Sequence, residues 1–567
     1  MRAISLLLFC AALTAVEAGA QTSAVIDIAR VAPGHWRATW HLSAPATSLT
    51  FERSAGFFRE QDWTVTTPGY RLARREDRQL ILLDGGAEPR SVIVADFRES
   101  TQPLPKEYEL FQPFSDGAVA LYTGHFYVMP AGPAYRDSTW IRTVRITPPP
   151  GGHGVLRGRV IPGLVAFTDS TGEGTYVYLG PARPIETPDM LAIVDAGMPA
   201  WLTGMLDRNL PRLFAAYRDR FDAPLPWKPT VLFSFKDTTL SGYSSGGGTL
   251  TGLINMTLTG SAWRTPGPEP AERAFHLIAH EAAHLWNGQL VESDPTNAGA
   301  WMHEGAADAM ADAMLVQFGV VDSARSRRRQ EEALNRCALA VTDGPVSTAI
   351  QRGAIRTVYD CGFVMAIWTA AAVHAARADA GLFTFWKDLV HAAMQRGGRY
   401  DQELYFSVLR GEAVPQDVID RMRAFLTGSD GFGLAVAGLR GNGVMVATGA
   451  GAPPAGYQQE LGRTAMLHLM GQACNRVDFN WGPPIRTGAV PDCRPFAAPM
   501  QVYRIEGFSP GRKGASTYDA VVSACAAGKE VKLQDEDGKT LSSVPCTQRL
   551  EPRPPWYVLE HSIAGLW

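Results

Sequence analysis

Residues 274–290 read AFHLIAHEAAHLWNGQL and contain the pentapeptide HEAAH at positions 280–284. Apolar residues recur through this stretch at helical spacing, which predicts an amphipathic helix. Positions four apart lie on one face of a helix, so the rings of His280 and His284 can bind one metal ion. Glu281 lies about 100° further round the helix. It would therefore stand beside that ion rather than on it, where a general base for an activated water belongs.

A third ligand follows in WMHEGAADAM (301–310), a second helical pattern after the polar loop ESDPTNAG. Nineteen residues separate His284 from Glu304, and two helices joined by such a loop can run antiparallel and bring Glu304 to the same ion. Asp308, one turn beyond Glu304, can accept the other ring N–H of a ligand histidine, and we expect this to be His280. Two histidines and one carboxylate leave a fourth position open for water, which is typical of a catalytic zinc site. The sequence therefore predicts one Zn²⁺ per chain.

These stretches resemble the gluzincin zinc metallopeptidases. HEAAHLWNGQLV (280–291) is similar to the HExxHxW(F)GN stretch of the aminopeptidase N family, and WMHEGAAD (301–308) to its W-x-N-E-G-F-A segment. HLWN also resembles the glycyl aminopeptidase family, whose members often carry a C-terminal PDZ domain. The spacing and the place of Asp308 are those of thermolysin-like enzymes, since aminopeptidase N relatives usually have one residue fewer. The resemblance covers residues 180–430 and implies a zincin catalytic domain that hydrolyses peptide bonds.

A tyrosine downstream extends the resemblance. VYDCG (358–362) is similar to the Y-E-K-G motif of the aminopeptidase N family, whose tyrosine donates a hydrogen bond to the developing oxyanion. The resemblance implies that Tyr359 stabilises the oxyanion, a task that needs a neutral phenol. Cys361 stands where the family usually has lysine, and an ordinary packed tyrosine is the alternative. Two further histidines lie near the motifs. We expect His276 to be a core residue or to contact a metal ligand from behind, and His303 to point elsewhere on its helix.

The family's G-x-M-E-N strand binds substrate along its edge and holds the free α-amine with its glutamate. Here the corresponding stretch is glycine-rich, and residues 238–268 contain no Asp or Glu. Gly246, Gly247 and Gly248 can still offer close backbone approach to an extended peptide, so we expect them to bind substrate; a mobile surface loop is the alternative. Without a paired carboxylate a buried ammonium is costly, so cleavage is expected to survive N-terminal blocking. Asp360 or an acid of the N-terminal domain could replace the missing glutamate.

Composition along the 567 residues predicts a multidomain α+β fold. Short alternating segments broken by Gly, Pro and Asp predict a β-rich N-terminal sandwich over residues 21–180. A thermolysin-like zincin domain with a helical lobe is expected over residues 181–430. Residues 431–567 begin Gly- and Pro-rich and carry four cysteines, which indicates a small C-terminal domain, disulfide-bonded or PDZ-like.

The N-terminus and the cysteines both favour export, to the periplasm or as a secreted protein. Residues 1–20 combine Arg2, a short apolar run and a small-residue cleavage site, as in a signal peptide, with a membrane anchor as the alternative. No later segment reaches eighteen consecutive apolar residues, so no transmembrane segment is expected after signal removal. Six cysteines remain and neighbour pairing is expected among many possible connectivities: Cys337–Cys361, Cys474–Cys493 and Cys525–Cys546.

The charge balance excludes one class of partner. A formal net charge of −3 and a pI near 6.5 give no pull toward nucleic acid, so the expected partner is a peptide or protein substrate. The function that the motifs favour is zinc-dependent peptide-bond hydrolysis with Glu281 as general base. Two alternatives remain open: a non-catalytic peptide-binding protein on a degenerate peptidase fold, and a zinc hydrolase of a non-peptide substrate. Aminopeptidase or endopeptidase action and oligomeric state are left undecided.

Overall fold

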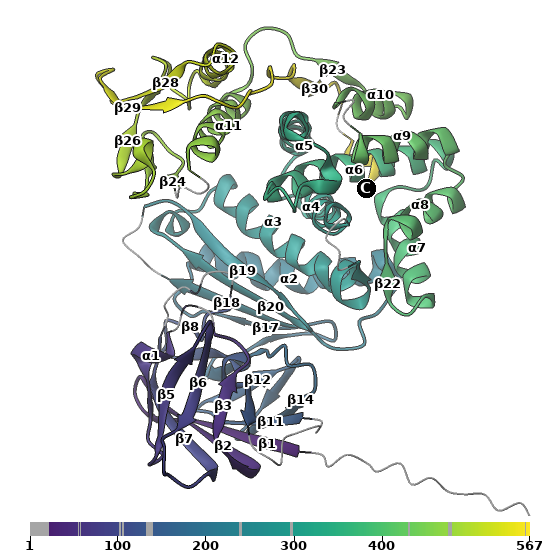
Figure 1. Cartoon of the computed structure of the whole chain (residues 1–567). Coiled ribbons are helices and arrows are strands. Elements are labelled where there is room, and N and C mark those ends of the chain that lie inside the picture. The colour runs from purple at the N-terminus through teal and green to yellow at the C-terminus, as the bar shows by residue number, and fades with distance from the viewer. Residues whose placement is uncertain are drawn as a thin grey trace, which may run out of the picture. The chain divides into compact units, whose positions relative to one another are not determined.

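The computed structural model describes residues 22–567 apart from 55, 57, 101–103, 105–106, 132–139, 237–240, 295–298, 429–430, 475–478 and 562. The signal peptide expected over residues 1–20 lies outside the described residues. The chain divides into two compact units, Met1–Thr203 with Trp227–Arg264, and Gly204–Pro226 with Thr265–Trp567. Strands make up most of the first unit and helices most of the second (Figure 1).

Three sheets of the first unit surround one apolar core. Their strand orders are β14-β11-β1-β2-β7-β4, β10-β3-β6-β5 and β13-β12-β15-β9-β8. All neighbouring pairs are antiparallel except β1 with β11, which are parallel. The strands are β1 (Thr22–Ala32), β2 (His35–Ala46), β3 (Ser48–Phe51), β4 (Trp63–Val65), β5 (Tyr70–Arg75), β6 (Arg78–Leu83), β7 (Arg90–Arg98), β8 (Phe111–Pro113), β9 (Val119–Tyr122), β10 (Val128–Ala131), β11 (Trp140–Thr147), β12 (His153–Leu156), β13 (Arg159–Ile161), β14 (Val165–Asp169) and β15 (Tyr176–Gly180), with the short helix α1 (Arg59–Asp62).

Alternation of side chains along these strands explains the core. On β2 the side chains of Trp36, Ala38 and Trp40 are fully buried, whereas those between them are partly or fully exposed. This is the period of two that places every second residue on the inner face of a sheet. The tryptophans pack with Trp63 and Phe97 in one cluster. The prediction of a β-rich N-terminal region is therefore confirmed.

A mixed sheet completes the first unit, in the order β16-β17-β18-β20-β19. Strands β17, β18 and β20 run parallel, and β19 lies antiparallel to β20 at the edge of the sheet. The glycine-rich stretch forms this edge strand, so it is not the loop that was its alternative interpretation. The strands are β16 (Ile185–Glu186), β17 (Leu191–Val194), β18 (Thr230–Lys236), β19 (Ser244–Leu250) and β20 (Leu253–Thr259).

Helices form most of the second unit, and α4 packs between α3 and α6 (Figure 1). Helix α3 starts at Pro268, where a missing N–H is tolerated, and buries an apolar stripe that includes Phe275 and Ile278. The helices are α2 (Ala200–Phe221), whose larger part belongs to this unit, α3 (Pro268–His284), α4 (Ala300–Gln317), α5 (Ser323–Ala340), α6 (Ile355–Ala376), α7 (Leu382–Gln395), α8 (Gln402–Gly411), α9 (Gln416–Thr427) and α10 (Gly433–Gly441). A π-helix (Leu285–Leu290) follows α3, and β21 (Glu292–Ser293) pairs with β22 (Arg399–Tyr400).

The last part of the second unit has its own apolar cluster. Helices α11 (Ala455–Ala473) and α12 (Gly514–Ala526) lie with two three-stranded sheets, and β23 (Val446–Thr448) pairs with β30 (Tyr557–Leu559). The sheets contain β24 (Phe479–Asn480), β25 (Ile485–Thr487) and β26 (Met500–Val502), and β27 (Arg504–Ile505), β28 (Glu530–Gln534) and β29 (Thr540–Pro545). The cysteines are paired as neighbour pairing predicts: Cys337–Cys361, Cys474–Cys493 and Cys525–Cys546.

Among the described residues, one helix is long and apolar enough to cross a membrane by length and composition. This is α6, and 83% of its apolar window is buried in the structure. A core helix of a folded domain has the same character, and α6 packs against α4, α5 and α7.

Candidate metal centre

Helices α3 and α4 bring the three predicted ligands together. The Nε2 atoms of His280 and His284 lie 3.0 Å apart, and Glu304 Oε2 lies 3.3 Å from the first and 3.4 Å from the second. Both rings are buried. The three atoms therefore form a nearly equilateral triangle inside the second unit.

The other ring nitrogen of each histidine has a hydrogen-bond partner. His280 Nδ1 lies 2.9 Å from Asp308 Oδ1, as the sequence predicts, and His284 Nδ1 lies 3.0 Å from Asn287 Oδ1. Because a carboxylate only accepts, the Nδ1 atom of His280 carries a hydrogen, so Nε2 is the nitrogen that can offer a lone pair to a metal ion in the triangle. Asn287 is a residue that the sequence motifs did not point to.

The donor set fits a zinc ion. Zinc bound tetrahedrally by nitrogen and oxygen at about 2.0–2.1 Å places its ligand atoms roughly 3.3 Å apart, close to the three separations found here. Glu304 Oε2 is buried, and no hydrogen bond of good geometry reaches it among the described residues. Two imidazole nitrogens and one carboxylate oxygen thus converge as acceptors, and a cation is the group that satisfies all three.

The charges around the triangle also favour a cation. Burial lowers the pKa of His280, but hydrogen bonds with Asp308 and Glu304 outweigh it and raise that pKa to about 10. Burial raises the pKa of Glu304, and its contacts with His280 and His284 then hold it far below the usual range. Without a metal ion, the raised pKa keeps His280 protonated, and this proton supplies the positive charge between the carboxylates. A metal ion that binds here would displace the proton and supply the positive charge instead.

The two predicted catalytic side chains lie beside this cluster. Glu281 follows His280 on α3 and is half-buried, and its charge acts to raise the pKa of His280. The ring of Tyr359, on α6, stacks on that of His280 with centroids 5.9 Å apart and planes 21° from parallel. Burial raises the pKa of Tyr359, and the charge of Glu304 and a hydrogen bond with it add to the effect, so the phenol is neutral.

Tyr359 is held in place by links from α6 to α5. Cys361 is disulfide-bonded to Cys337, and Asp360 pairs with Arg336 at 2.7 Å. Burial raises the pKa of Asp360 to about 6 despite the lowering effect of Arg336. Asp360, one of the acids considered for binding a substrate amine, therefore already has a cation as its partner.

The two neighbouring histidines differ from each other. His276 Nε2 approaches Asp308 Oδ1 at 3.4 Å, so it contacts the carboxylate that holds His280, one of the two expectations for this residue. His303 stacks on His284 with centroids 4.0 Å apart, so the expectation that it points away from the site is wrong. Burial lowers the pKa of His303 to about 3, and the ring is neutral. Its place one residue before Glu304 was the signal that could have found it.

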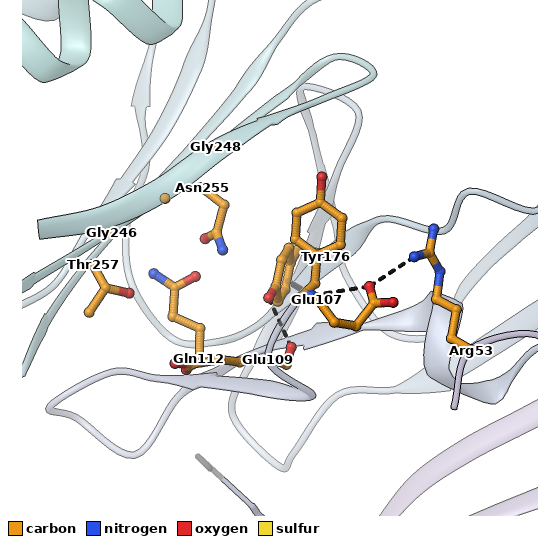
Figure 2. Close-up of a pocket in the computed structure, with 11 residues that line it drawn as sticks. Arg53, Glu107, Glu109, Gln112, Tyr176, Gly246, Gly248, Asn255 and Thr257 are labelled. Atoms are coloured by element: carbon orange, nitrogen blue, oxygen red, sulfur yellow. Dashed lines mark hydrogen bonds and ion pairs between the residues drawn. The ribbon is translucent and has the colours of Figure 1, made fainter. Parts of the chain in front are cut away.

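The glycine strand β19 lines a pocket within the first unit. The pocket has a volume of about 480 Å³, and its walls include Gly246, Gly247 and Gly248 with Glu107, Tyr108, Glu109, Gln112, Tyr176, Asn255 and Thr257. In Figure 2 the side chains of Gln112 and Asn255 point toward each other beside this strand, and Arg53 lies against Glu107. The Arg53–Glu107 pair measures 2.8 Å, and Glu109 pairs with Lys236 at 3.1 Å. Two acids that the strand itself lacks are thus supplied by residues 107–109.

Comparisons with known proteins give the fold. No protein-family model matches the sequence, and no curated protein matches it. An aminopeptidase N family protein from Idiomarina loihiensis is similar in structure, with a TM-score of 0.62 and 12% identity over 96% of this chain and 99% of that one. The chain has the aminopeptidase N fold. This structural similarity confirms two predictions from the sequence: the resemblance to the aminopeptidase N family and the multidomain α+β fold class.

Two further solved structures are less similar to the chain than the Idiomarina protein is. An M1 zinc metallopeptidase from Deinococcus radiodurans has a TM-score of 0.40 and 16% identity, over 72% of this chain and 93% of that one. A yeast LTA4 hydrolase has a TM-score of 0.39 and 12% identity, over 80% of this chain and 73% of that one.

Proposed function

We propose that this protein is a zinc-dependent peptidase whose metal ion is bound by His280, His284 and Glu304, one ion per chain. The observation that carries the proposal is the convergence of three ligand atoms 3.0–3.4 Å apart, with no well-aligned hydrogen bond to Glu304 Oε2 among the described residues. The fold shared with an aminopeptidase N family protein supports the same reaction class.

The residues around the ion have separable tasks. A zinc ion in such a site polarises a carbonyl group and lowers the pKa of water. Glu281 accepts the proton of the attacking water and passes it to the leaving amine, since its carboxylate directly follows His280 on α3 and its charge acts on that ring. Tyr359 donates a hydrogen bond to the developing oxyanion, and its raised pKa keeps the hydroxyl protonated for that purpose. Asp308 holds the ring of His280 by its Nδ1–H.

The edge strand β19 is proposed to bind the substrate, a peptide or protein. An exposed edge offers backbone N–H and C=O groups to an extended peptide, and side chains at Gly246, Gly247 and Gly248 would stand in its way. A Cβ at Gly246 or Gly248 would meet nothing within 4 Å, so the space along this strand is open.

Two further proposals concern the cellular location of the protein and its domain boundaries. We propose export to the periplasm or beyond, on the sequence of residues 1–20 and the three disulfides of the second unit. Residues 21–180, 181–430 and 431–567 are proposed as the N-terminal, catalytic and C-terminal domains.

The experiment uses the full-length mature chain and a mixture of unrelated peptides. A chelator should abolish cleavage, and added zinc should restore it. Binding of peptides without any cleavage by the zinc-loaded protein would favour the degenerate binding protein. Cleavage of an epoxide or ester, with every peptide intact, would favour the non-peptide hydrolase.

A further inference from the structure

The six residues that follow His284 leave the α-helical path. Helix α3 ends at His284, and Leu285–Leu290 form a π-helix, a wider turn that is often found at functional sites. The turn is held from outside: Trp286 donates through Nε1 to Ala223 O at 2.8 Å and stacks on Phe221 with centroids 5.6 Å apart. Asn287 lies in the middle of this turn and is fully buried.

The hydrogen bonds of Asn287 fix the direction of its amide. Its Nδ2 lies 2.9 Å from the backbone oxygen of His303, which can only accept, so the NH₂ group faces that oxygen. Oδ1 must then face His284 Nδ1, 3.0 Å away, and that nitrogen must carry the hydrogen. The lone pair of His284 is therefore on Nε2, which faces His280 and Glu304.

The backbone of Asn287 is fixed as firmly as its side chain. Its oxygen accepts from the hydroxyl of Tyr400 at 2.6 Å and from His303 Nδ1 at 3.1 Å. Asn287 and His303 thus exchange two hydrogen bonds, and the ring of His303 covers the face of His284. Asn287 therefore holds the ring of His284 at its edge, through Nδ1, and His303 holds it on its face.

We infer that Asn287 is a positioning residue: it sets the tautomer and the ring orientation of His284, so that Nε2 is presented to the metal. The inference rests on the proposed function, because it takes the ion to be bound at this triangle. Asn287 is fully buried, so replacing it with an apolar side chain of similar volume leaves a buried N–H of His284 without an acceptor. A ligand histidine usually has such a partner, and its removal typically weakens metal affinity by roughly ten- to a hundred-fold.

Two substitutions separate positioning from mere packing. Asn287→Asp keeps an acceptor for His284 but loses the donor to His303 O, whereas Asn287→Leu loses both at similar volume. If Asn287 acts on the metal, Asn287→Asp should lower folding stability and yet bind zinc within about threefold of the wild type. Asn287→Leu should bind zinc roughly ten- to a hundred-fold more weakly than the wild type. Asn335→Leu is the matched control, since Asn335 is also buried and hydrogen-bonded on both sides of its amide but lies on α5, away from the triangle.

The measurement is a competition titration of the folded, metal-free full chain with zinc and a chromogenic chelator. The visible spectrum of the cobalt-loaded protein is a second readout of ligand orientation and should change more in Asn287→Leu than in Asn287→Asp. Wild-type zinc affinity in Asn287→Leu, or equally weak zinc binding by both variants, would overturn the inference and leave the proposed site intact. Should Asn287→Leu fail to fold, a loss of zinc affinity above tenfold in Asn287→Asp would overturn the inference. Absence of zinc binding by the wild type would overturn the proposed function itself.

Discussion

Gly305 on α4 and Gly362 on α6 pack in direct backbone contact. A methyl group on Gly305 would lie 2.0 Å from the carbonyl carbon of Gly362, and one on Gly362 would lie 2.2 Å from Trp301 O. Two helices can come this close only where neither has a side chain. The contact places Glu304, next to Gly305, on the same side as Tyr359, one turn before Gly362.

Gly305→Ala should therefore push α4 from α6 and lower the free energy of unfolding by about 1–3 kcal/mol, as overpacking does. Zinc affinity should fall with it because Glu304 moves. Denaturant unfolding of the zinc-free protein measures the first effect, and chelator competition the second. Gly471→Ala is the control: Gly471 lies in α11 with nothing within 4 Å of an added Cβ, so alanine should leave both quantities unchanged or slightly raise stability. Equal effects of the two substitutions would contradict this explanation.

Asp308 is predicted to support the metal without binding it. Asp308→Ala removes the acceptor of His280 Nδ1 and should weaken zinc binding by roughly ten- to a hundred-fold, with one zinc still bound at saturation. Asp308 and Glu332 both line a small cavity of about 240 Å³ between α3, α4, α5 and α6. Glu332→Ala, which removes another acid of this cavity without touching His280, is the control. Unchanged affinity in Asp308→Ala would show that the hydrogen bond has no influence on the metal.

Tyr359 is predicted to act in the transition state. Tyr359→Phe keeps the ring that stacks on His280 but loses the hydroxyl, so kcat should fall roughly 10²- to 10³-fold while KM and zinc content change little. Steady-state kinetics on one good peptide gives the split between kcat and KM. A rise in KM alone would assign the hydroxyl to substrate binding, against the role proposed here.

The sequence predicted what is local and periodic. His280, His284 and Glu304 lie on helices whose 3.6-residue repeat fixes which side chains share a face, and the structure brings them together accordingly. Asn287 could not be found this way, because the π-helix after His284 breaks that repeat. Glu107 and Glu109 were missed for another reason: they reach the glycine strand from a segment some 140 residues earlier, a pairing that no local pattern encodes.

Those two acids bear on the choice between exopeptidase and endopeptidase. Both carboxylates already have a cation, Arg53 for Glu107 and Lys236 for Glu109, so neither is free to hold a substrate ammonium. We therefore expect a peptide acetylated at its N-terminus to be cleaved as well as its free counterpart, with the cut bond identified by mass spectrometry. Stepwise trimming of the free peptide, with the acetylated one intact, would contradict this and make Glu109→Gln the next variant to test.

The central claim is that the triangle binds zinc and that Glu281 is the base beside it. The most direct test measures zinc content and peptide hydrolysis together in Glu281→Gln, a nearly isosteric change that leaves all three ligands in place. The account predicts one zinc per chain and no measurable turnover, with His284→Ala beside it losing the zinc as well. Hydrolysis by Glu281→Gln at near wild-type rate, or full zinc retention by His284→Ala, would contradict it.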